Sequence, residues 1–581
     1  MTAAETHESS PRNPLRLWPG VVLAVLMGLA RFVLPTVFPE TVFAAIISGV
    51  LGTLLIVLWW AFFSRAPHLE RWGALALMVL GFFVTSQLVH VSIATGMMGM
   101  MPVMFLVPTL GLALVAGAVA GRHLARGPRR LALAAAILLA CAGWTLVRTG
   151  GMTGGAEQDF AWRWSATPEE RLLAQAGNEA TALPATLDPA ETGASWPGFR
   201  GPHRDGHVAG VQIQTDWAQS PPVELWRRPV GPGWSSFAVR GDLLYTQEQR
   251  GDNEVVACYQ ATNGEPVWMH EDEARFWESI GGAGPRGTPT LSGDRVYTLG
   301  ATGILNVLNA SDGSAVWSRN VVADTGVEVP GWGFAGSPLV VDDLVIVAAA
   351  GKLVAYDLAT GEPRWQGPTR GMSYSSPDLV TLGGVSQVLL LTASGMTSVA
   401  PADGATLWEH SWPGDSRCVQ PALTSDGDVL LGSSFDTGVG MRRIAVEHGS
   451  DGWTTQERWT STGLKPFFND FVVHKGYAYG FDGRILACVD VANGERKWKG
   501  GRYGAGQLLL LPDQDLLLVI SEQGDMGLVQ ATPEGFTELA RLPAIKGKTW
   551  NHPVLAGDLL LVRNAEEMAA FRLTLARRAE G

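Results

Sequence analysis

The chain has 581 residues, of which 46% are hydrophobic and 17% are charged, and its formal net charge is −12 at pH 7. This length is too great for one hydrophobic core and indicates more than one domain. The negative charge, without a stretch rich in Lys and Arg in the second part of the chain, argues against nucleic acid as a partner. The mean hydropathy of +0.13 averages an apolar first part with an ordinary soluble second part.

Five apolar stretches in the first part of the chain predict transmembrane helices. Each is close to the roughly 20 residues that are needed to cross a bilayer. They lie near Leu17–Leu34, Thr41–Phe63, Trp72–Ala94, Met101–Ala120 and Leu131–Val147. The sequence therefore predicts a cytoplasmic N-terminus over residues 1–16 and an all-α transmembrane domain of about five helices over residues 17–147.

The positive charges of the connecting loops predict the orientation of these helices. Arginine occurs before the first stretch, between the second and third, and between the fourth and fifth, at Arg12, Arg16, Arg65, Arg71, Arg122, Arg126, Arg129 and Arg130. The alternate loops, Pro35–Glu40 and Thr95–Met100, contain neither Lys nor Arg. The positive-inside rule then places the N-terminus in the cytoplasm, and five crossings export the rest of the chain. In a bacterium this arrangement is an inner-membrane anchor with a periplasmic domain.

Polar and sulfur-containing side chains also occur within the membrane domain. Arg31 lies inside the first stretch and His90 lies near the outer end of the third, close to a cluster of methionines. Ionisable groups at such depth are candidates for function, and a quinone pocket or a soft-metal site is one interpretation. The other interpretation is that Arg31 extends to the interface or pairs with a neighbouring helix while Met fills space.

Residues 148–195 connect the membrane domain to the second part of the chain. The segment begins with the Gly-rich run Thr149–Gly155 and contains Thr167-Pro168-Glu169-Glu170, in which an N-cap Thr is paired with a Glu three residues later. A short periplasmic helix is therefore predicted within this linker. Trp162 and Trp164 are expected either at the membrane interface or packed on the domain that follows.

Between Asn263 and Trp498 the chain repeats one motif, a turn ending in Gly, then three residues and a Trp. Clear copies end at Trp268, Trp317, Trp365, Trp408 and Trp498, and a degenerate copy ends at Trp459. A period of 43 to 49 residues between the first four is typical of propellers and solenoids. Each period contains four short β-branched runs separated by turns, which predicts a four-stranded antiparallel blade. The repeated Trp is expected to fill the space between neighbouring blades.

The two ends of the repeat region indicate a closed ring. The last period lacks its Trp strand, whereas Glu224-Leu225-Trp226 is a Trp strand with no blade before it. We expect this N-terminal strand to complete the C-terminal blade, which gives an all-β propeller of eight four-stranded blades over residues 196–581.

Residues that precede the first strand of each blade are predicted to surround one mouth of the central channel. They form a ring rich in aromatic side chains, with charged groups among them, as expected of a ligand site. The alternative is that they plug the channel and satisfy one another. These candidate binding residues are Trp234, Arg286, Trp332, Tyr374, Arg417, Asp470, Trp550, Asn551 and His552.

The Trp repeats, the segment Trp196-Pro197-Gly198-Phe199-Arg200-Gly201-Pro202 and the segment Tyr479-Gly480-Phe481-Asp482-Gly483 resemble the pyrroloquinoline-quinone (PQQ) repeat propeller family. That family contains quinoprotein dehydrogenases and also non-enzymatic propellers of the outer-membrane assembly type. The resemblance covers the chain from about Ser195 to the C-terminus. It implies the fold more strongly than a function, because one propeller serves several chemistries.

Two functions follow from this resemblance and remain open at this point. The first is a binding or scaffold module in the cell envelope, with the lipid bilayer and a periplasmic protein or other envelope component as partners. The second is a membrane-bound, PQQ-dependent dehydrogenase of sugars or alcohols that passes electrons to ubiquinone, because the membrane part resembles that of glucose dehydrogenases of this class. PQQ and Ca²⁺ would then be its cofactors, and Asp470 its catalytic base.

The residues favour the first of these functions. The sequence contains no Cys-Cys pair, although membrane-type glucose dehydrogenases lack that pair as well. The blades are short, without the long insertions that build a cofactor chamber, and the metal ligands of the dehydrogenases have no recognisable counterparts. We therefore predict no metal site and no firmly bound cofactor.

Overall fold

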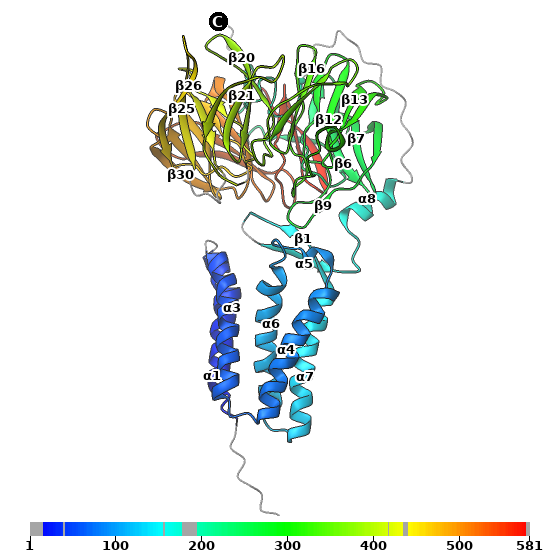
Figure 1. The fold of residues 1–581 in the computed structure, drawn as a ribbon, viewed down its shortest axis with the longest axis vertical. Helices are drawn as coiled ribbons and strands as arrows, with labels where there is room; N and C mark the ends of the chain where they lie inside the picture. Colours follow the sequence, from blue (N-terminus) through cyan, green and yellow to red (C-terminus); the bar gives the residue numbers. More distant parts are fainter. Residues whose placement is uncertain are drawn as a thin grey trace, which may run out of the picture. The chain divides into compact units, whose positions relative to one another are not determined.

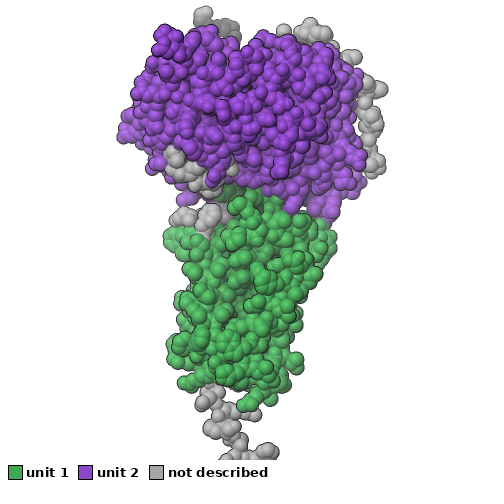
Figure 2. Space-filling view, viewed as in Figure 1, with its two compact units in different colours: residues 1–165, 279–281 green, residues 166–278, 282–581 purple. Residues whose placement is uncertain are grey.

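A computed structural model describes residues 15–38, 41–154, 157–176, 195–415, 417–433 and 440–576. The chain divides into two compact units (Figure 2). The helical unit comprises residues 1–165 and 279–281, and the propeller unit comprises residues 166–278 and 282–581.

Helices of the first unit follow one another with short connections (Figure 1). Three of them include π-helical segments, labelled η. The elements are α1 (Trp18–Gly28), η1 (Leu29–Val33), α2 (Leu34–Val37), α3 (Val42–Leu58), η3 (Trp59–Phe63), α4 (His68–Leu88), α5 (Val91–Ala94), η4 (Pro102–Leu106), α6 (Val107–Ala120) and α7 (Arg126–Thr145).

Among the described residues, four helical stretches are long and apolar enough to cross a membrane. They are Trp18–Val37, Ala44–Phe63, His68–Leu88 and Pro102–Ala120. The sequence predicted about five. The fifth stretch is helical, as α7, but the arginines of its first turns reduce its apolar character.

Glycines allow the helices of this unit to approach one another closely. A Cβ atom on Gly20 of α1 would lie 2.3 Å from the ring of Trp59, and one on Gly111 of α6 would lie 2.8 Å from Oγ1 of Thr53 in α3. Small residues at such positions permit tight packing of apolar helices. Figure 1 shows the resulting pairs, α1 beside α3 and α7 beside α4 and α6.

A β-hairpin follows α7, which the sequence did not predict. Strand β1 (Val147–Met152) pairs with β2 (Gln158–Trp162) in antiparallel register, with Val147 opposite Trp162. The hairpin includes the start of the Gly-rich run that was expected only to open a linker.

The short helix predicted in the linker is present as α8 (Pro168–Ala176). The backbone N–H of Glu170 donates to Oγ1 of Thr167 at 3.0 Å, and the backbone N–H of Thr167 donates to the Glu170 carboxylate at 2.6 Å. This reciprocal pair is the predicted capping box. The Ala-, Thr- and Pro-rich remainder of the linker lies outside the described residues.

Eight antiparallel sheets make up the propeller, as predicted. Blade 1 is β5 (Ala238–Arg240), β6 (Leu243–Arg250), β7 (Asn253–Gln260) and β8 (Pro266–Glu273), extended by β3 (Ser195–Trp196); blade 2 is β11 (Thr290–Ser292), β12 (Arg295–Leu299), β13 (Ile304–Asn309) and β14 (Ala315–Asn320); blade 3 is β15 (Leu339–Val341), β16 (Leu344–Ala349), β17 (Lys352–Asp357) and β18 (Pro363–Gln366); blade 4 is β19 (Asp378–Leu382), β20 (Val385–Thr392), β21 (Gly395–Val399) and β22 (Thr406–Ser411).

The second half of the ring continues in the same way. Blade 5 is β23 (Ala422–Leu423), β24 (Val429–Gly432), β25 (Met441–Gly449) and β26 (Gly452–Ser461); blade 6 is β27 (Val472–His474), β28 (Tyr477–Asp482), β29 (Ile485–Asp490) and β30 (Arg496–Arg502); blade 7 is β31 (Gln507–Leu511), β32 (Leu516–Ile520), β33 (Asp525–Gln530) and β34 (Glu538–Pro543); blade 8 is β35 (Val554–Ala556), β36 (Leu559–Arg563), β37 (Glu567–Arg572) and β4 (Val223–Pro229).

The ring closes through β4, which precedes blade 1 in sequence but is the outer strand of blade 8. It pairs antiparallel with β37, and Trp226 lies opposite Ala570. This is the closure that the sequence predicted. It leaves no free edge between the first and last blades.

The Gly-to-Trp motif connects each blade to the next. The indole N–H of Trp268 in blade 1 donates to the carbonyl of Ala310 in blade 2 at 3.0 Å. Its ring lies on Gly313, where an added Cβ would be 2.4 Å from the ring. Equivalent indole-to-carbonyl bonds to the next blade are made by Trp226, Trp317, Trp365, Trp459 and Trp498. Trp408 differs, because it donates to Gln387 of its own blade at 2.7 Å.

Candidate functional site

The first strands of the blades line the central channel, since successive first strands such as β11 and β15, or β27 and β31, contact one another. The loops that precede these strands therefore gather at one mouth. All nine residues predicted as the binding ring lie in such loops. Their side chains nevertheless take four different positions.

Aromatic side chains from the loops before five blades form one continuous row of ring contacts at this mouth. Successive ring centroids along the row are 4.8 to 5.9 Å apart, within the range of favourable aromatic pairs. We call this row the aromatic arc, and it consists of Tyr374, Trp332, Phe467, Phe468, Trp550 and Trp234. The sequence analysis identified four of these six residues. It missed Phe467 and Phe468, although two adjacent aromatic residues shortly before the first strand of a blade could have indicated them.

Polar groups at one end of the arc fix its rings. The ammonium of Lys548 lies 4.4 Å from the ring centroid of Trp550 and 5.2 Å from that of Trp234. The indole N–H of Trp550 donates to the Glu522 carboxylate at 2.8 Å. A cation held over two indoles places a positive charge beside an apolar surface.

Arg286 does not face the open mouth. Its guanidinium donates to the backbone carbonyls of Gly282, Ala283 and Trp332 at 2.9 to 3.3 Å and forms an ion pair with Glu278 at 3.2 Å. Burial lowers the pKa of Arg286 to about 10. These bonds hold the small hairpin of β9 (Trp277–Glu278) and β10 (Gly282–Ala283), and they commit the donors of the side chain to it.

Arg417 is enclosed in the wall of blade 5. It is 1% exposed, donates to the carbonyl of Trp412 at 2.7 Å, and stacks on the Trp412 ring at 4.7 Å. Burial lowers its pKa. Its Nε and Nη1 atoms have no hydrogen-bond partner among the described residues.

Asp470, Asn551 and His552 lie in the channel behind the arc. One Asp470 oxygen accepts the backbone N–H of Gln420 at 2.6 Å, and the other lies 3.3 Å from Nε2 of His552. Burial alone would raise the pKa of Asp470, but Arg200 and His552 hold it below its ordinary value. The amide of Asn551 donates to the Ser235 carbonyl at 2.7 Å.

The N-terminal segment of the propeller occupies this channel. We call residues 196–208 the plug. Arg200 donates to the carbonyl of Phe471 before blade 6 at 2.7 Å, and Arg204 donates to that of Ser337 before blade 3 at 2.9 Å. The backbone N–H of Val208 donates to the carbonyl of Leu510 in blade 7 at 2.8 Å. The plug therefore fastens blades on opposite sides of the ring.

Sequence reasoning did not assign a role to Arg200 and Arg204. Both have positive φ angles, 58° and 56°, which bulky residues rarely adopt. The segment Phe199-Arg200-Gly201 through Arg204-Asp205-Gly206 contained the signal, namely two arginines each set close to a Gly in the part of the chain that carries the family resemblance.

The channel residues do not fit a Ca²⁺-bound quinone. Calcium takes six to eight oxygen ligands, mainly carboxylates and carbonyls. The Asp470 carboxylate is already held by Gln420, His552 and Arg200, and burial raises the pKa of nearby Asp378 to about 6. Two guanidiniums, of Arg200 and Arg204, lie where a cation would have to bind. Within the described ranges, no group of three His, Cys, Asp or Glu side chains is placed to hold a metal ion.

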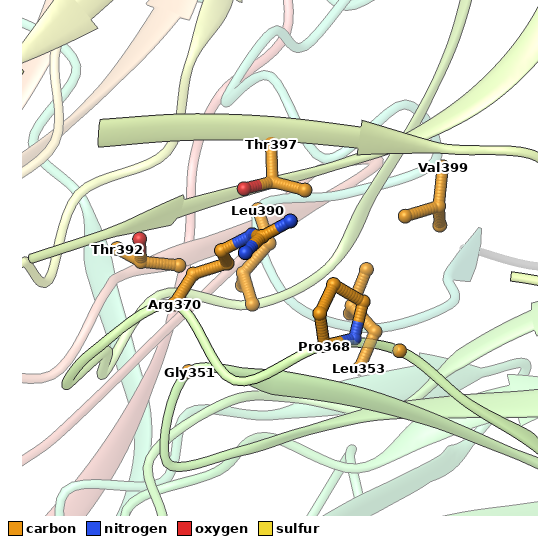
Figure 3. A pocket seen from close by; sticks show the side chains of 9 residues that line it. Gly351, Leu353, Pro368, Arg370, Leu390, Thr392, Thr397 and Val399 are labelled. Carbon is orange, nitrogen blue, oxygen red and sulfur yellow. The ribbon is translucent and has the colours of Figure 1, made fainter. Parts of the chain in front are cut away.

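A pocket between blades 3 and 4 is also too small for a cofactor. Its cavity volume is about 10 Å³, roughly the space that one water molecule needs. Figure 3 shows Leu353 and Pro368 on one side of it and Thr397 and Val399 on the other. The Arg370 guanidinium forms an ion pair with Glu409, so its charge is already neutralised.

Comparisons with known proteins support the resemblance found in the sequence. Residues 218–381 and 252–500 match the family model described as outer membrane protein assembly factor BamB. BamB of Yersinia pestis is 23% identical over 326 residues, which cover 53% of this chain and 70% of the relative.

Two solved structures are similar in fold. That of BamB from Moraxella catarrhalis is 15% identical, with a TM-score of 0.44, and the match covers 62% of this chain and 99% of that one. The quinohemoprotein alcohol dehydrogenase of Comamonas testosteroni is 13% identical, with a TM-score of 0.47, and the match covers 72% and 86%. The sheet order makes the second part of this chain an eight-bladed β-propeller. The match to the family model agrees with the PQQ-like repeats that the resemblance implied.

Proposed function

We propose that the protein is a membrane-anchored binding module of the bacterial cell envelope, whose aromatic arc binds a protein partner in the periplasm. The observation that carries this proposal is the continuous row of half-buried aromatic rings at one mouth. Aromatic side chains are enriched at protein interfaces and contribute most of the binding energy there.

The filled channel behind the arc favours a partner that binds at the surface. Arg200 of the plug, Asp470 and His552 satisfy one another inside the channel and leave it closed to a cofactor-sized ligand. A macromolecular surface can contact the rings without entering the channel. Lys548 at the end of the arc would attract an acidic group of that partner.

The names of the relatives are consistent with this proposal. The family model and the Yersinia pestis relative are both described as outer membrane protein assembly factors. By contrast, the dehydrogenase alternative has in its favour a likeness of the propeller fold and of the membrane part, and one fold serves many functions.

The anchor in this proposal crosses the inner membrane five times, with α7 as its last span. The 20 residues of α7 are about 30 Å long, which matches the hydrocarbon core of a bilayer. Arg129 near its start donates two hydrogen bonds to the buried Glu70 carboxylate, at 2.8 and 2.9 Å. This ion pair offsets the charge that lowers the apolar character of α7. The arginine-rich loops support a cytoplasmic N-terminus.

Two tryptophans at the end of the β1–β2 hairpin support the proposal of a membrane anchor. Trp162 and Trp164 stack with centroids 5.2 Å apart and planes at 8°, and they are 53% and 68% exposed. Indole rings are enriched where a membrane meets water. We propose that this pair lies at the membrane interface.

Photo-crosslinking tests the binding role. A benzophenone amino acid replaces Trp332 in the arc or, as the matched control, Trp453, a half-buried Trp that stacks on His448 in the β25–β26 hairpin. In cells of the native organism, light should join the Trp332 variant to a discrete protein and leave the Trp453 variant unmodified. Equal crosslinking at both positions, or none at Trp332, would contradict the proposal.

A further inference from the structure

Arg31 lies inside the membrane span Trp18–Val37 with an incompletely satisfied charge. Its contacts are with aromatic rings: Cζ lies 4.7 Å from the centroid of Phe105 and 5.6 Å from that of Phe32. No hydrogen bond or ion pair joins its guanidinium to any residue that the structure describes. A guanidinium has five N–H donors, and a charged group at this depth is retained mainly where it has a function.

The contact between Arg31 and Phe105 joins two irregular parts of the membrane helices. Arg31 is the central residue of η1, and Phe105 belongs to η4. Pro35 and Pro108 follow these segments and cannot donate the helical hydrogen bonds to the carbonyls four residues earlier, which accounts for the irregular geometry. π-helical segments are rare and occur often at functional sites. Here two of them meet at one guanidinium.

The surroundings of Phe105 place this contact near one surface of the membrane. The Phe105 ring packs against Trp144, in the last turn of α7, at 5.9 Å and against Phe160 of the β1–β2 hairpin at 5.6 Å. The span that carries Arg31 ends at Val37, roughly 9 Å farther along the helix axis. A long arginine side chain can cover most of that distance. The guanidinium lies on Phe105, which is three residues, or roughly 5 Å, inside the start of the span Pro102–Ala120.

We propose that Arg31 binds the phosphate of a phospholipid in the leaflet on the hairpin side of the membrane, with the Phe105 ring beneath the guanidinium. The Arg31 Cζ atom lies over the Phe105 ring, and the guanidinium N–H groups donate to no residue that the structure describes. The forked arrangement of the guanidinium N–H groups matches the oxygens of a phosphate. The phosphate also supplies a negative charge to pair with the guanidinium. Phe32 and Val33 beside Arg31 are 57% and 49% exposed and offer apolar surface to the acyl chains.

Native mass spectrometry of the full chain, released from nanodiscs made of its native membrane, tests this site by counting retained phospholipids. Wild-type protein should retain phospholipid, and Arg31→Gln should lower the occupancy at least about tenfold, as expected when charge-assisted hydrogen bonds are lost. Arg163→Gln is the matched control, because it removes the same charge from an exposed arginine beside the hairpin. It should leave the occupancy unchanged. Arg31→Lys should give an intermediate value.

The mass of the bound molecule distinguishes the sources of the ligand. A phospholipid supports the proposal, whereas inorganic phosphate or a neutral quinone in its place would overturn it. Equal phospholipid occupancy in wild type and Arg31→Gln would also overturn it. If Arg31→Gln does not fold, Phe105→Leu is the second variant, because it retains the charge and the apolar volume. Unchanged phospholipid occupancy in Phe105→Leu would refute the role of the Phe105 ring and with it the site.

Discussion

His552 and Asp470 meet inside the channel, with Nε2 of the imidazole 3.3 Å from Oδ2 of the carboxylate. They come from the loops before blades 8 and 6, so that their contact passes over blade 7. Arg200 of the plug lies 3.7 Å from the same carboxylate oxygen. The three side chains thus connect two blades that share no sheet contact, and Asp470 has the surroundings of a structural group.

Replacing Asp470 with Asn should therefore destabilise the protein. Asn can still accept the backbone hydrogen bond of Gln420, but it leaves the Arg200 guanidinium without its counter-charge, at a cost of about 3 kcal/mol. Thermal unfolding of the purified chain measures the effect. Asp294→Asn, at an exposed carboxylate, should be almost neutral. An unchanged melting temperature for Asp470→Asn would show that the ion pair does not stabilise the channel.

Supplying PQQ and Ca²⁺ to the purified protein should give no sugar- or alcohol-dependent reduction of an artificial electron acceptor. The reason is the charge of the channel, where Arg200 and Arg204 lie beside the carboxylates. A dye-reduction assay with a known PQQ dehydrogenase as positive control makes the measurement. Turnover that appears on reconstitution and disappears in Asp470→Asn would instead identify a quinoprotein dehydrogenase with Asp470 as its base.

Two glycines with similar backbone angles test the Trp contact between blades. Gly313 has φ +71° and Gly293 has φ +56°, so Ala is strained at both. Only at Gly313 would the new Cβ meet a ring, that of Trp268 at 2.4 Å, whereas nothing lies within 4 Å at Gly293. Gly313→Ala should cost about 1–3 kcal/mol more than Gly293→Ala in urea unfolding. Equal losses would mean that the ring moves freely.

Glu254 should make stability depend on pH. Burial raises the pKa of Glu254 to about 7 from an ordinary value of 4.5, although the N–H of Ala301 and the hydroxyl of Thr302 donate to it. Between these two pKa values the folded protein binds more protons than the unfolded chain. The contribution of Glu254 to stability is therefore present below about pH 4.5 and is lost as pH rises through 7.

The comparison of pH 5 with pH 8 measures this contribution. Urea unfolding should show a difference of about 2 kcal/mol that is present in wild type and absent in Glu254→Gln. Glu265→Gln, at an exposed position in a turn of the same blade, should retain the wild-type difference. The assignment fails if Glu254→Gln and wild type have parallel pH profiles.

Reporter fusions decide whether α7 is a span. Alkaline phosphatase fused after Gly581 should be active, because five crossings export it, whereas a fusion after Gly127 should be inactive in the cytoplasm. A fusion in the loop Thr95–Met100 should be active and serves as the control. An inactive C-terminal fusion beside that active control would mean that α7 does not cross and that the chain has four spans.

The periodic part of this fold could be predicted because its contacts recur along the chain. Trp268 donates to Ala310, 42 residues and one blade later, and Trp317 and Trp365 make the same bond over 41 and 36 residues. The unpaired Trp226 strand sufficed to predict the ring closure, which the pairing of β4 with β37 confirms.

The candidate site was less accessible to sequence reasoning, since its geometry depends on contacts without a period. Arg200 and Phe471 are 271 residues apart in sequence, and no repeat connects them. Arg286 and Arg417 occupy the expected loops, yet the β9–β10 hairpin and Trp412 determine where their guanidiniums lie. The fifth span differs for a simpler reason, because apolar length and charge conflict within α7.

The closure of the ring also orders events during synthesis. Arg227 of β4 forms an ion pair with Glu567 of β37, 340 residues later. Strand β4 leaves the ribosome before any blade is complete. It has no partner strand until the last blade has been synthesised. A chain that stops early keeps both edges exposed, available to chaperones and proteases. The pairing of β4 with β37 therefore forms only in a chain whose synthesis is complete.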